Sequence, residues 1–321
     1  MQTAIAAEVA LDYIGLRGAQ ARRAIADGNL ASQLETLQIT QWRMQAGLAT
    51  SLEAEQARAA LEQTRAQLPV LQTSIEQTRH ALAVLTGKAP AALANVLAAA
   101  GPVPRAADDL VLGIPAETLR QRPDVRAAEL QVTAAMARVA QADAARAPNF
   151  KLGGSLGLGA ATLDALTHGA SVLRTLLASA SLPVFDAGAL RAQVRVQQAA
   201  LDKSGAAYQA AVLGALKDVE DALIALRGDR ERLARLQLAA AAAGNASMLA
   251  RQRFFSGLVD FQIVLETQRT QLNTQDSVAG SSADLSADHV RLYKALGGGW
   301  RAEGSDALPA ADDNISRNGL Q

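Results

Sequence analysis

The side chains that could carry acid–base, nucleophilic or metal chemistry are few and widely spaced in this sequence. The three histidines, His80, His168 and His289, lie more than 80 residues apart, and the chain contains no cysteine. A metal site or a catalytic pair needs such groups at a short, defined spacing or gathered around a pocket. The sequence therefore predicts that the protein is not an enzyme and that it binds neither a metal nor a cofactor.

Two further motifs contain residue types that carry chemistry elsewhere. Asp108 and Asp109 form a carboxylate pair, but they stand in a stretch rich in Ala, Pro and Gly without a partner histidine. That setting favours a solvated loop over an acid–base dyad. Three glycines at 297–299 follow a helical pattern, with no strand before them and no helix after them. They therefore do not match a phosphate-binding loop.

Composition excludes other classes of partner. Aromatic residues make up only 3% of the 321 residues, which suits helices packed side by side better than a thick globular core. Lys and Arg together number 31, as do Asp and Glu, so the net charge gives no reason to expect nucleic acid as a partner. No stretch of 18 apolar residues predicts a transmembrane helix, although this test does not address strands that alternate. The first residues show neither the pattern of a signal peptide nor a cysteine for a lipid anchor.

The elements that must position any functional residue are long helices. No proline interrupts the chain between Pro183 and Pro309. A break near Gly257 predicts a turn, because glycine readily takes the left-handed conformation that ends a helix. The stretch before this turn shows a seven-residue apolar repeat with two leucines four places after its first members, which predicts a coiled-coil seam. The repeat runs through Val212, Val219, Leu226, Leu233 and Ala240, and the two added leucines are Leu216 and Leu223.

The second helical hairpin repeats the first at an offset of 210 residues. The offset places Arg43 on Arg253 and Gly87 on Gly297 without an insertion. It also matches the glycine–leucine pairs at the two expected tips, which are Gly47, Leu48, Gly257 and Leu258. This agreement indicates a duplicated unit.

A different periodicity follows Pro148. Residues 149–158 alternate, with Phe150, Leu152, Leu156 and Leu158 on one side of a predicted strand and Lys151, Gly153, Ser155 and Gly157 on the other. A second alternating segment ends before Pro183, with Leu177 as its exception. Two interpretations remain open, a membrane-barrel hairpin with its apolar side outward and a soluble hairpin packed on helices.

Taken in order, these elements resemble the outer-membrane efflux protein family, the trimeric TolC-like channel-tunnels of Gram-negative bacteria, and especially its branch that serves resistance-nodulation-division drug pumps. The resemblance rests on both tips and on four segments, which are Arg122–Glu129, Leu182–Gly188, Val264–Arg269 and Leu292–Trp300. It implies a mainly α fold in which long antiparallel coiled-coil hairpins form an α-barrel wall and one β-hairpin contributes to a membrane β-barrel. The complete protein is expected to be trimeric.

The resemblance also implies roles for single residues. Gly47, Leu48, Gly257 and Leu258 would lie at tips that face a periplasmic adaptor protein. Glu266 and Arg269 resemble positions where charged side chains narrow the periplasmic aperture, although a solvated ion pair three residues apart on one helix face is the simpler interpretation. The apolar side of the strands would face outer-membrane lipid.

The expected division of the chain follows the pattern of these elements. It comprises a first helical hairpin at 1–87, a connector at 88–121, a long helix at 122–147, a β-hairpin at 148–185, a second helical hairpin at 186–299 and a disordered tail at 300–321.

The first repeat lacks a strand pair of its own, so the sequence resembles the last two thirds of a family member, shortened at its N-terminus. Three such chains would bring about six strands, where the family uses twelve.

The leading functional hypothesis is a passive conduit in the outer membrane and periplasm, one part of a tripartite system with an adaptor and an inner-membrane pump. Two alternatives remain: a soluble coiled-coil scaffold that binds partners through its tips, and the outer-membrane channel of a type I secretion system.

Overall fold

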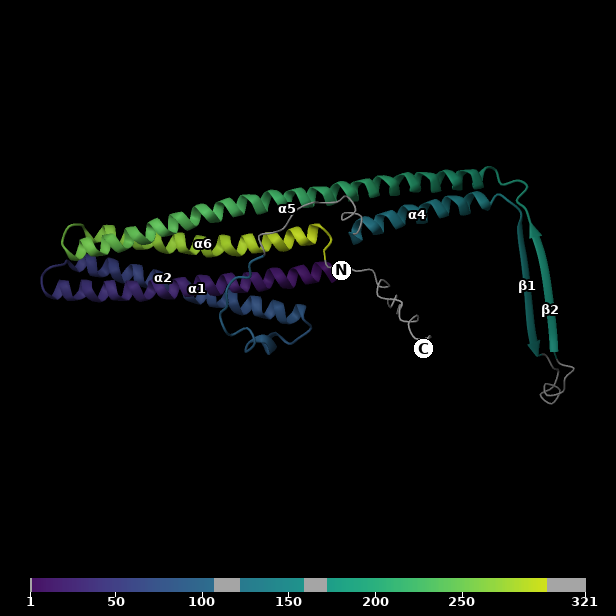
Figure 1. The fold of residues 1–321 in the computed structure, drawn as a ribbon. Helices are drawn as coiled ribbons and strands as arrows, with labels where there is room; N and C mark the ends of the chain where they lie inside the picture. The colour runs from purple at the N-terminus through teal and green to yellow at the C-terminus, as the bar shows by residue number, and fades with distance from the viewer. Residues whose placement is uncertain (1, 107–121, 159–171, 299–321) are drawn as a thin grey trace, which may run out of the picture. The chain divides into compact units, whose positions relative to one another are not determined.

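The computed structural model describes residues 2–106, 122–158 and 172–298, except for the side chains of Leu158, Val172 and Leu173. The fold is mainly α-helical. The elements in chain order are α1 (Gln2–Gln45), α2 (Ser51–Leu85), the short 3-10 helix η1 (Pro90–Leu93), α4 (Pro123–Ala144), strands β1 (Asn149–Leu158) and β2 (Val172–Ser181), α5 (Ala189–Phe255) and α6 (Phe261–Ala295) (Figure 1).

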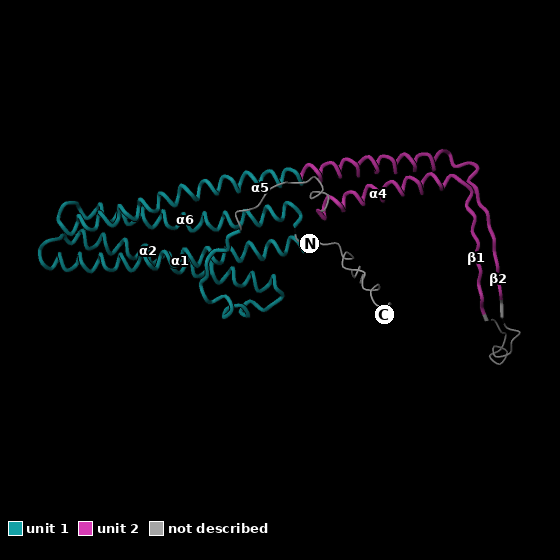
Figure 2. Tube along the Cα trace, viewed as in Figure 1, with its two compact units in different colours: residues 1–121, 215–321 teal, residues 122–214 magenta. Residues whose placement is uncertain are grey.

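The chain divides into two compact units (Figure 2). Unit 1 comprises residues 1–121 and 215–321, so it contains α1, α2, the C-terminal part of α5 and α6. Unit 2 comprises residues 122–214, with α4, both strands and the start of α5. Among the described residues, none of the helices has the combination of length and hydropathy that a membrane crossing would demand.

The 210-residue repeat is visible in the helix ends. Helix α1 ends at Gln45 and α5 at Phe255, while α2 and α6 begin and end at positions that differ by the same offset. Each of these four helices is followed by a glycine in the left-handed region, with φ of 73° at Gly47, 70° at Gly87, 71° at Gly257 and 76° at Gly297. Helices α1 and α5, which end at the tips, and helices α2 and α6, which end away from the tips, therefore all terminate in the same way.

Helix α1 packs against both α2 and α6 in unit 1. The approach to α6 is close at Gly18, where an added Cβ would lie 2.9 Å from the Cβ of Ala283. Further along, Arg22 and Asp276 form a two-bonded ion pair with N–O distances of 2.6 and 2.8 Å. The close helix approach at Gly18 and the ion pair of Arg22 and Asp276 thus both contribute to the contact between α1 and α6.

The buried seam of α5 corrects one detail of the sequence pattern. Val219 and Leu226 are buried as expected, but Leu216 is 43% exposed and Ala215 is buried in its place. Ala222 likewise stands at the buried position next to Leu223. Side chains of neighbouring helical positions lie on adjacent faces, and the smaller one allows the closer helix contact.

The connector after α2 is attached to the helices of unit 1 by hydrogen bonds to its backbone. Arg17 donates to the carbonyl oxygen of Ala99 at 2.6 Å, and Ser286 donates to that of Pro104 at 2.7 Å. The rest of the expected connector, including Asp108 and Asp109, lies outside the described residues, as does the expected tail at 300–321.

The two strands of unit 2 form an antiparallel pair whose register places Phe150 opposite Ala180 and Leu152 opposite Ala178. Residues directly opposite one another point to the same face of such a pair. The even-numbered residues of both strands therefore share one face, which is apolar except for Arg174. The other face carries small and polar residues together with Leu173 and Leu177.

Candidate functional site

The two tips of unit 1 are built in the same way. The N–H of Gly47 donates to the carbonyl of Met44 at 3.0 Å, and the N–H of Leu48 donates to that of Arg43 at 2.8 Å. The second tip repeats this pair of bonds, from Gly257 to Phe254 at 3.0 Å and from Leu258 to Arg253 at 2.9 Å. These bonds use carbonyl groups that the helix end leaves free. Both leucines project into solvent, with Leu48 70% and Leu258 73% exposed.

The helices that leave the two tips start differently. Thr50 and Glu53 form a capping box at the start of α2, in which each side chain accepts a hydrogen bond from the backbone N–H of the other. Asp260 caps α6 without a side-chain bond of this kind. Side-chain hydrogen bonds therefore fix the start of α2 after the first tip, and the start of α6 after the second tip has no such capping bond.

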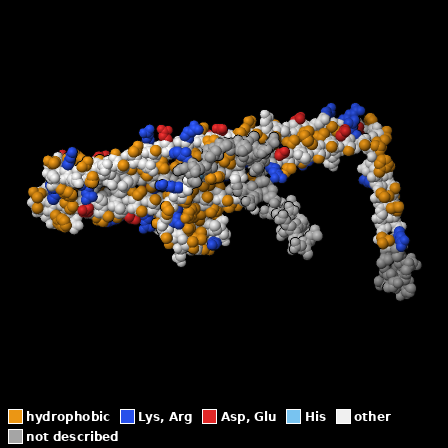
Figure 3. All heavy atoms as spheres, in the orientation of Figure 1, with side chains coloured by type: hydrophobic (Ala, Val, Ile, Leu, Met, Phe, Trp, Pro, Cys, Tyr) orange, Lys and Arg blue, Asp and Glu red, His pale blue; other side chains and the backbone are white. Residues whose placement is uncertain are grey.

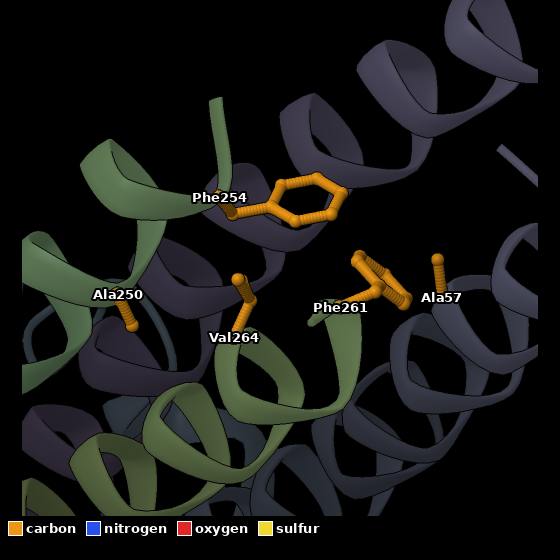
Figure 4. Close-up of a cluster of buried hydrophobic side chains, with 5 residues drawn as sticks. All are labelled: Ala57, Ala250, Phe254, Phe261 and Val264. Atoms are coloured by element: carbon orange, nitrogen blue, oxygen red, sulfur yellow. The ribbon is translucent and has the colours of Figure 1, made fainter. Parts of the chain in front are cut away.

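A buried cluster fastens the two hairpins together just behind the tips. Phe254 of α5, Phe261 and Val264 of α6 and Ala57 of α2 gather here with Ala250 (Figure 4). The rings of Phe254 and Phe261 have centroids 5.3 Å apart in a tilted arrangement, which suits their quadrupoles. The tips therefore extend from a fixed base.

Arg43 joins the tips across this cluster. Its guanidinium carbon lies 4.5 Å from the ring centre of Phe254, and its Nη1 donates to the carbonyl oxygen of Phe254 at 3.3 Å. The sequence analysis named Arg43 only as a repeat match and missed this contact. The repeat offered only a partial signal. It marks Arg43 and Arg253 as equivalent positions, although Arg253 is exposed.

Further apolar side chains are exposed around the tips. Trp42 is 58% exposed, Leu52 65% and Phe255 48%. With Leu48 and Leu258 they form a group that we call the tip leucine–aromatic surface. Apolar groups gathered in this way on a polar helical hairpin are typical of an interaction site.

Glu266 and Arg269 form an ion pair on the surface of α6. Their Oε2 and Nη2 atoms are 2.7 Å apart, and the side chains are 54% and 68% exposed. The pair lies on one face of the helix, as the spacing predicts.

The ion pair borders a groove between α1, α2 and α6 that is lined largely by amide side chains. The lining includes Gln33, Gln56, Gln63, Gln67, Gln262, Gln268 and Asn273. The repeat offset equates Glu266 with Gln56 and Arg269 with Ala59, both of which also line the groove. Among the residues that line the groove, the two charges therefore belong to the second repeat only, and the rest of the lining is uncharged.

The apolar face of the strand pair is open to solvent in this chain. Phe150 is 78% exposed, Leu152 and Leu156 are each 75%, and Leu176 is 79%. Hydrophobic side chains are visible along both strands (Figure 3). Leu158 belongs to β1, but its side chain lies outside the described residues. The interpretation as a soluble hairpin packed on helices is therefore not met within this chain.

The segment that leads from β2 into α5 contains a helix cap that the sequence analysis did not assign. The carboxylate of Asp186 accepts hydrogen bonds from the backbone N–H groups of Leu190 at 2.8 Å and Gly188 at 3.0 Å. These bonds lower the pKa of Asp186, with the bond from Leu190 as the largest cause. Ala187 and Gly188 both have left-handed backbones, with φ of 52° and 86°. Aspartate just before a helix was the available signal.

A related contact begins α4. Arg122 makes a two-bonded ion pair with Asp124, at 2.8 and 3.1 Å, across Pro123 in the first turn. The bond to Arg122 is the largest cause of a lowered pKa of Asp124. The Arg-Pro-Asp-Val segment therefore fixes the start of α4, because proline suits the first helical turn and a carboxylate suits the positive end of a helix.

The structure describes two of the three histidines. His80 is exposed, and His289 is buried with its Nδ1 2.7 Å from the carbonyl oxygen of Leu285. His168 lies outside the described residues. Within the described ranges, no three acidic or histidine side chains are grouped so as to hold a metal ion.

Comparison with known proteins identifies close relatives of this arrangement. The toluene efflux pump outer membrane protein TtgF of Pseudomonas putida is 34% identical over 313 residues, which cover 97% of this chain and 64% of that protein. Outer membrane protein OprJ of Pseudomonas aeruginosa is 32% identical over 297 residues, covering 92% of this chain and 62% of that protein. The chain thus spans slightly less than two thirds of the length of these curated relatives.

Solved structures agree. The outer-membrane channel OprN matches with a TM-score of 0.86 and 35% identity over 93% of this chain and 67% of that one. VceC of Vibrio cholerae, at 24% identity, shows the same fold with a TM-score of 0.81 over 93% of this chain and 71% of that one. Of these proteins, TtgF is named as an efflux pump protein and OprN as an outer-membrane channel. The model of the family described as outer membrane efflux protein matches residues 1–88 and 114–298. The chain belongs to the outer membrane efflux protein family.

Proposed function

We propose that the protein is the outer-membrane channel component of a tripartite efflux system, a passive conduit that carries drugs or other small molecules across the periplasm and outer membrane. In this role the channel changes no covalent bond, and its partners supply energy and selectivity. The proposed partners are a periplasmic adaptor, an inner-membrane pump, outer-membrane lipid and two further copies of the chain.

The exposed apolar face of the strand pair is the observation that carries this proposal. Phe150, Leu152 and Leu156 are each at least 75% exposed, on the face opposite Lys151 and Ser155. An alternating strand with one apolar side is the pattern of a lipid-facing barrel strand. A soluble scaffold would leave this face in contact with water, which opposes that alternative.

The tips are the proposed docking sites for the adaptor. Gly47 and Gly257 allow each chain reversal, and Leu48 and Leu258 project from it. Exposed leucines on a fixed base can enter apolar grooves of a partner without rearrangement of the hairpin. The tip leucine–aromatic surface supplies the remaining contact area.

Glu266 and Arg269 are the proposed aperture residues. Three chains would place three such pairs around an opening, where charged rings control the passage of ions. Because each pair is internally neutral, such a ring narrows the opening without adding net charge.

The experiment that tests this function is reconstitution of the full chain into lipid vesicles and planar bilayers. We expect co-flotation with vesicles, trimers under native conditions and stepwise conductance. A monomer that stays in the aqueous fraction and conducts nothing would contradict the proposal.

Two arginine substitutions on opposite faces of β1 provide a matched comparison. Leu152→Arg places a charge on the apolar face and should abolish co-flotation, since arginine at the middle of a bilayer costs about 2–4 kcal/mol on a lipid-facing strand. Ser155→Arg, three residues away on the other face, should retain it. Equal loss or equal retention in both variants would count against lipid contact by the apolar face.

A further inference from the structure

Two aspartates interrupt the otherwise apolar seam between α5 and α6. Buried residues of α5 follow a heptad pattern through Ala215, Val219, Ala222 and Leu226, and the next seam position is Asp229. On α6, Asp288 lies in the buried row with Leu292 and Ala295. A charged residue at a seam position lowers stability unless it has a partner.

Asp288 is among the most enclosed charged side chains that the structure describes. The residue is 2% exposed, and its Oδ1 accepts a hydrogen bond from Nη1 of Arg291 at 2.6 Å. Its Oδ2 is buried and receives no hydrogen bond from a donor in the described residues. A buried carboxylate oxygen without a donor costs free energy when the group is ionised, so this position favours the protonated form.

Asp229 of α5 contacts the carboxyl group of Asp288. Its side chain is 25% exposed and lies within hydrogen-bonding reach of Asp288. Two carboxylates in contact cannot both ionise at low cost, whereas one shared proton turns their repulsion into a hydrogen bond. Desolvation by burial is the largest cause of a raised pKa of Asp288, and the contact with Asp229 adds to it.

The surrounding charges do not cancel the rise in the pKa of Asp288. Arg291 favours the ionised form of Asp288 but is 56% exposed in its side chain. On α5, Arg232 lies 3.7 Å from Asp229 and 3.8 Å from Asp284 of α6, so its charge is divided between two carboxylates. His289 faces its own helix backbone, and it lines a neighbouring cavity together with Arg230 and Arg105 of the connector.

We propose that Asp288 keeps its proton in the folded state, with Asp229 as the hydrogen-bond acceptor, and that the pair forms an acid-stabilised latch between α5 and α6, near the end of the hairpin opposite the tip. Loss of the proton leaves two facing carboxylates and loosens this end. Because the folded pKa of Asp288 lies above its unfolded value, the stabilising contribution is fully present below the unfolded pKa. It is lost as the pH rises through the folded pKa.

The test is thermal unfolding of the full chain between pH 4 and pH 8 for the wild type and three substitutions. Asp288→Asn removes the buried carboxyl and keeps its shape, and Asp229→Asn removes the carboxylate of its partner on α5. Asp221→Asn is the matched control, because Asp221 is an exposed carboxylate of α5 that pairs only with Lys217 among the described residues.

The difference in Tm between each latch variant and the wild type should increase with pH, by about 2 °C or more across the range. The double variant should show the same increase as Asp288→Asn, whereas Asp229→Asn alone should show a smaller one, because Asp288 stays buried in that variant. The control should show no such trend. A difference that stays constant with pH for both latch variants, or equals that of the control, would overturn the latch.

Discussion

The guanidinium carbon of Arg43 on α1 lies 4.5 Å from the ring centre of Phe254 on α5, so a single side chain of the first tip holds the second. The same side chain donates a hydrogen bond to the backbone carbonyl of Phe254. The residues are 211 positions apart. This contact makes the spacing of the two tips a property of the fold rather than of any partner.

Removing this contact should weaken the tip end of unit 1. Arg43→Ala should lower the free energy of unfolding by about 1–2 kcal/mol, the sum of one partly buried cation–π contact and one hydrogen bond. Denaturant unfolding of the full chain in detergent measures it. Arg253→Ala is the control, since the equivalent arginine is exposed and should change stability by less than about 0.5 kcal/mol. Equal effects in the two variants would mean that Arg43 does not tie the tips.

The tips and helix ends could be predicted because their signals are local. A left-handed glycine that ends a helix can be predicted from about four or five neighbouring residues. The 210-residue offset supplied each such signal twice, as at Gly47 and Gly257. Alternation likewise assigned the faces of β1, because the side-chain period of a strand is two.

The partners across helices could not be predicted in this way. Arg43 and Arg253 occupy equivalent positions, each four residues before the glycine of its tip, yet the packing of α1 against α5 brings Arg43 onto Phe254. The seam of α5 was ambiguous for the same reason, because Ala215 and Leu216 are neighbours and the facing helix selects the smaller. The Asp229–Asp288 contact depends on the alignment of two helices joined through a distant tip.

The second prediction concerns the left-handed glycine of the second tip. Gly257→Val should strain the backbone by about 1–2 kcal/mol, because φ is 71° there, although an added Cβ would meet no atom within 4 Å. Helix content by circular dichroism should change little, while drug resistance conferred by a reconstituted efflux system should fall. Gly257→Asn is the milder comparison, since asparagine tolerates the left-handed region better. Unchanged resistance with the valine would remove the tip from adaptor docking.

The third prediction follows from the cap at Asp186. Because bonds from Leu190 and Gly188 lower the folded pKa of this carboxyl, its contribution to stability is fully present above the unfolded pKa. It is lost as the pH falls through the folded pKa. Hydrogen exchange of the first turn of α5, corrected for intrinsic rates, should therefore quicken at strongly acidic pH in the wild type. Asp186→Asn, which cannot ionise, should remove this acid-dependent step, and a step that persists would assign it to another group.

The fourth prediction separates a pore role of Glu266 from a structural one. An exposed ion pair contributes at most about 1 kcal/mol, so Glu266→Gln should leave the unfolding midpoint almost unchanged. In a trimeric channel the same change would expose three unbalanced Arg269 charges at the opening and shift ion selectivity toward anions. Bilayer recordings of reversal potential in a salt gradient measure this shift.

The matched control is Glu55→Gln on α2. Glu55 pairs with Arg58 at 2.9 Å with the same three-residue spacing and similar exposure. The repeat offset, however, equates Glu266 with Gln56, so Glu55 lies about 100° further round its helix. Removing its charge should leave selectivity unchanged. If both substitutions shift the reversal potential equally, or neither does, the Glu266–Arg269 pair is an ordinary surface ion pair and the narrowing lies elsewhere on the hairpins.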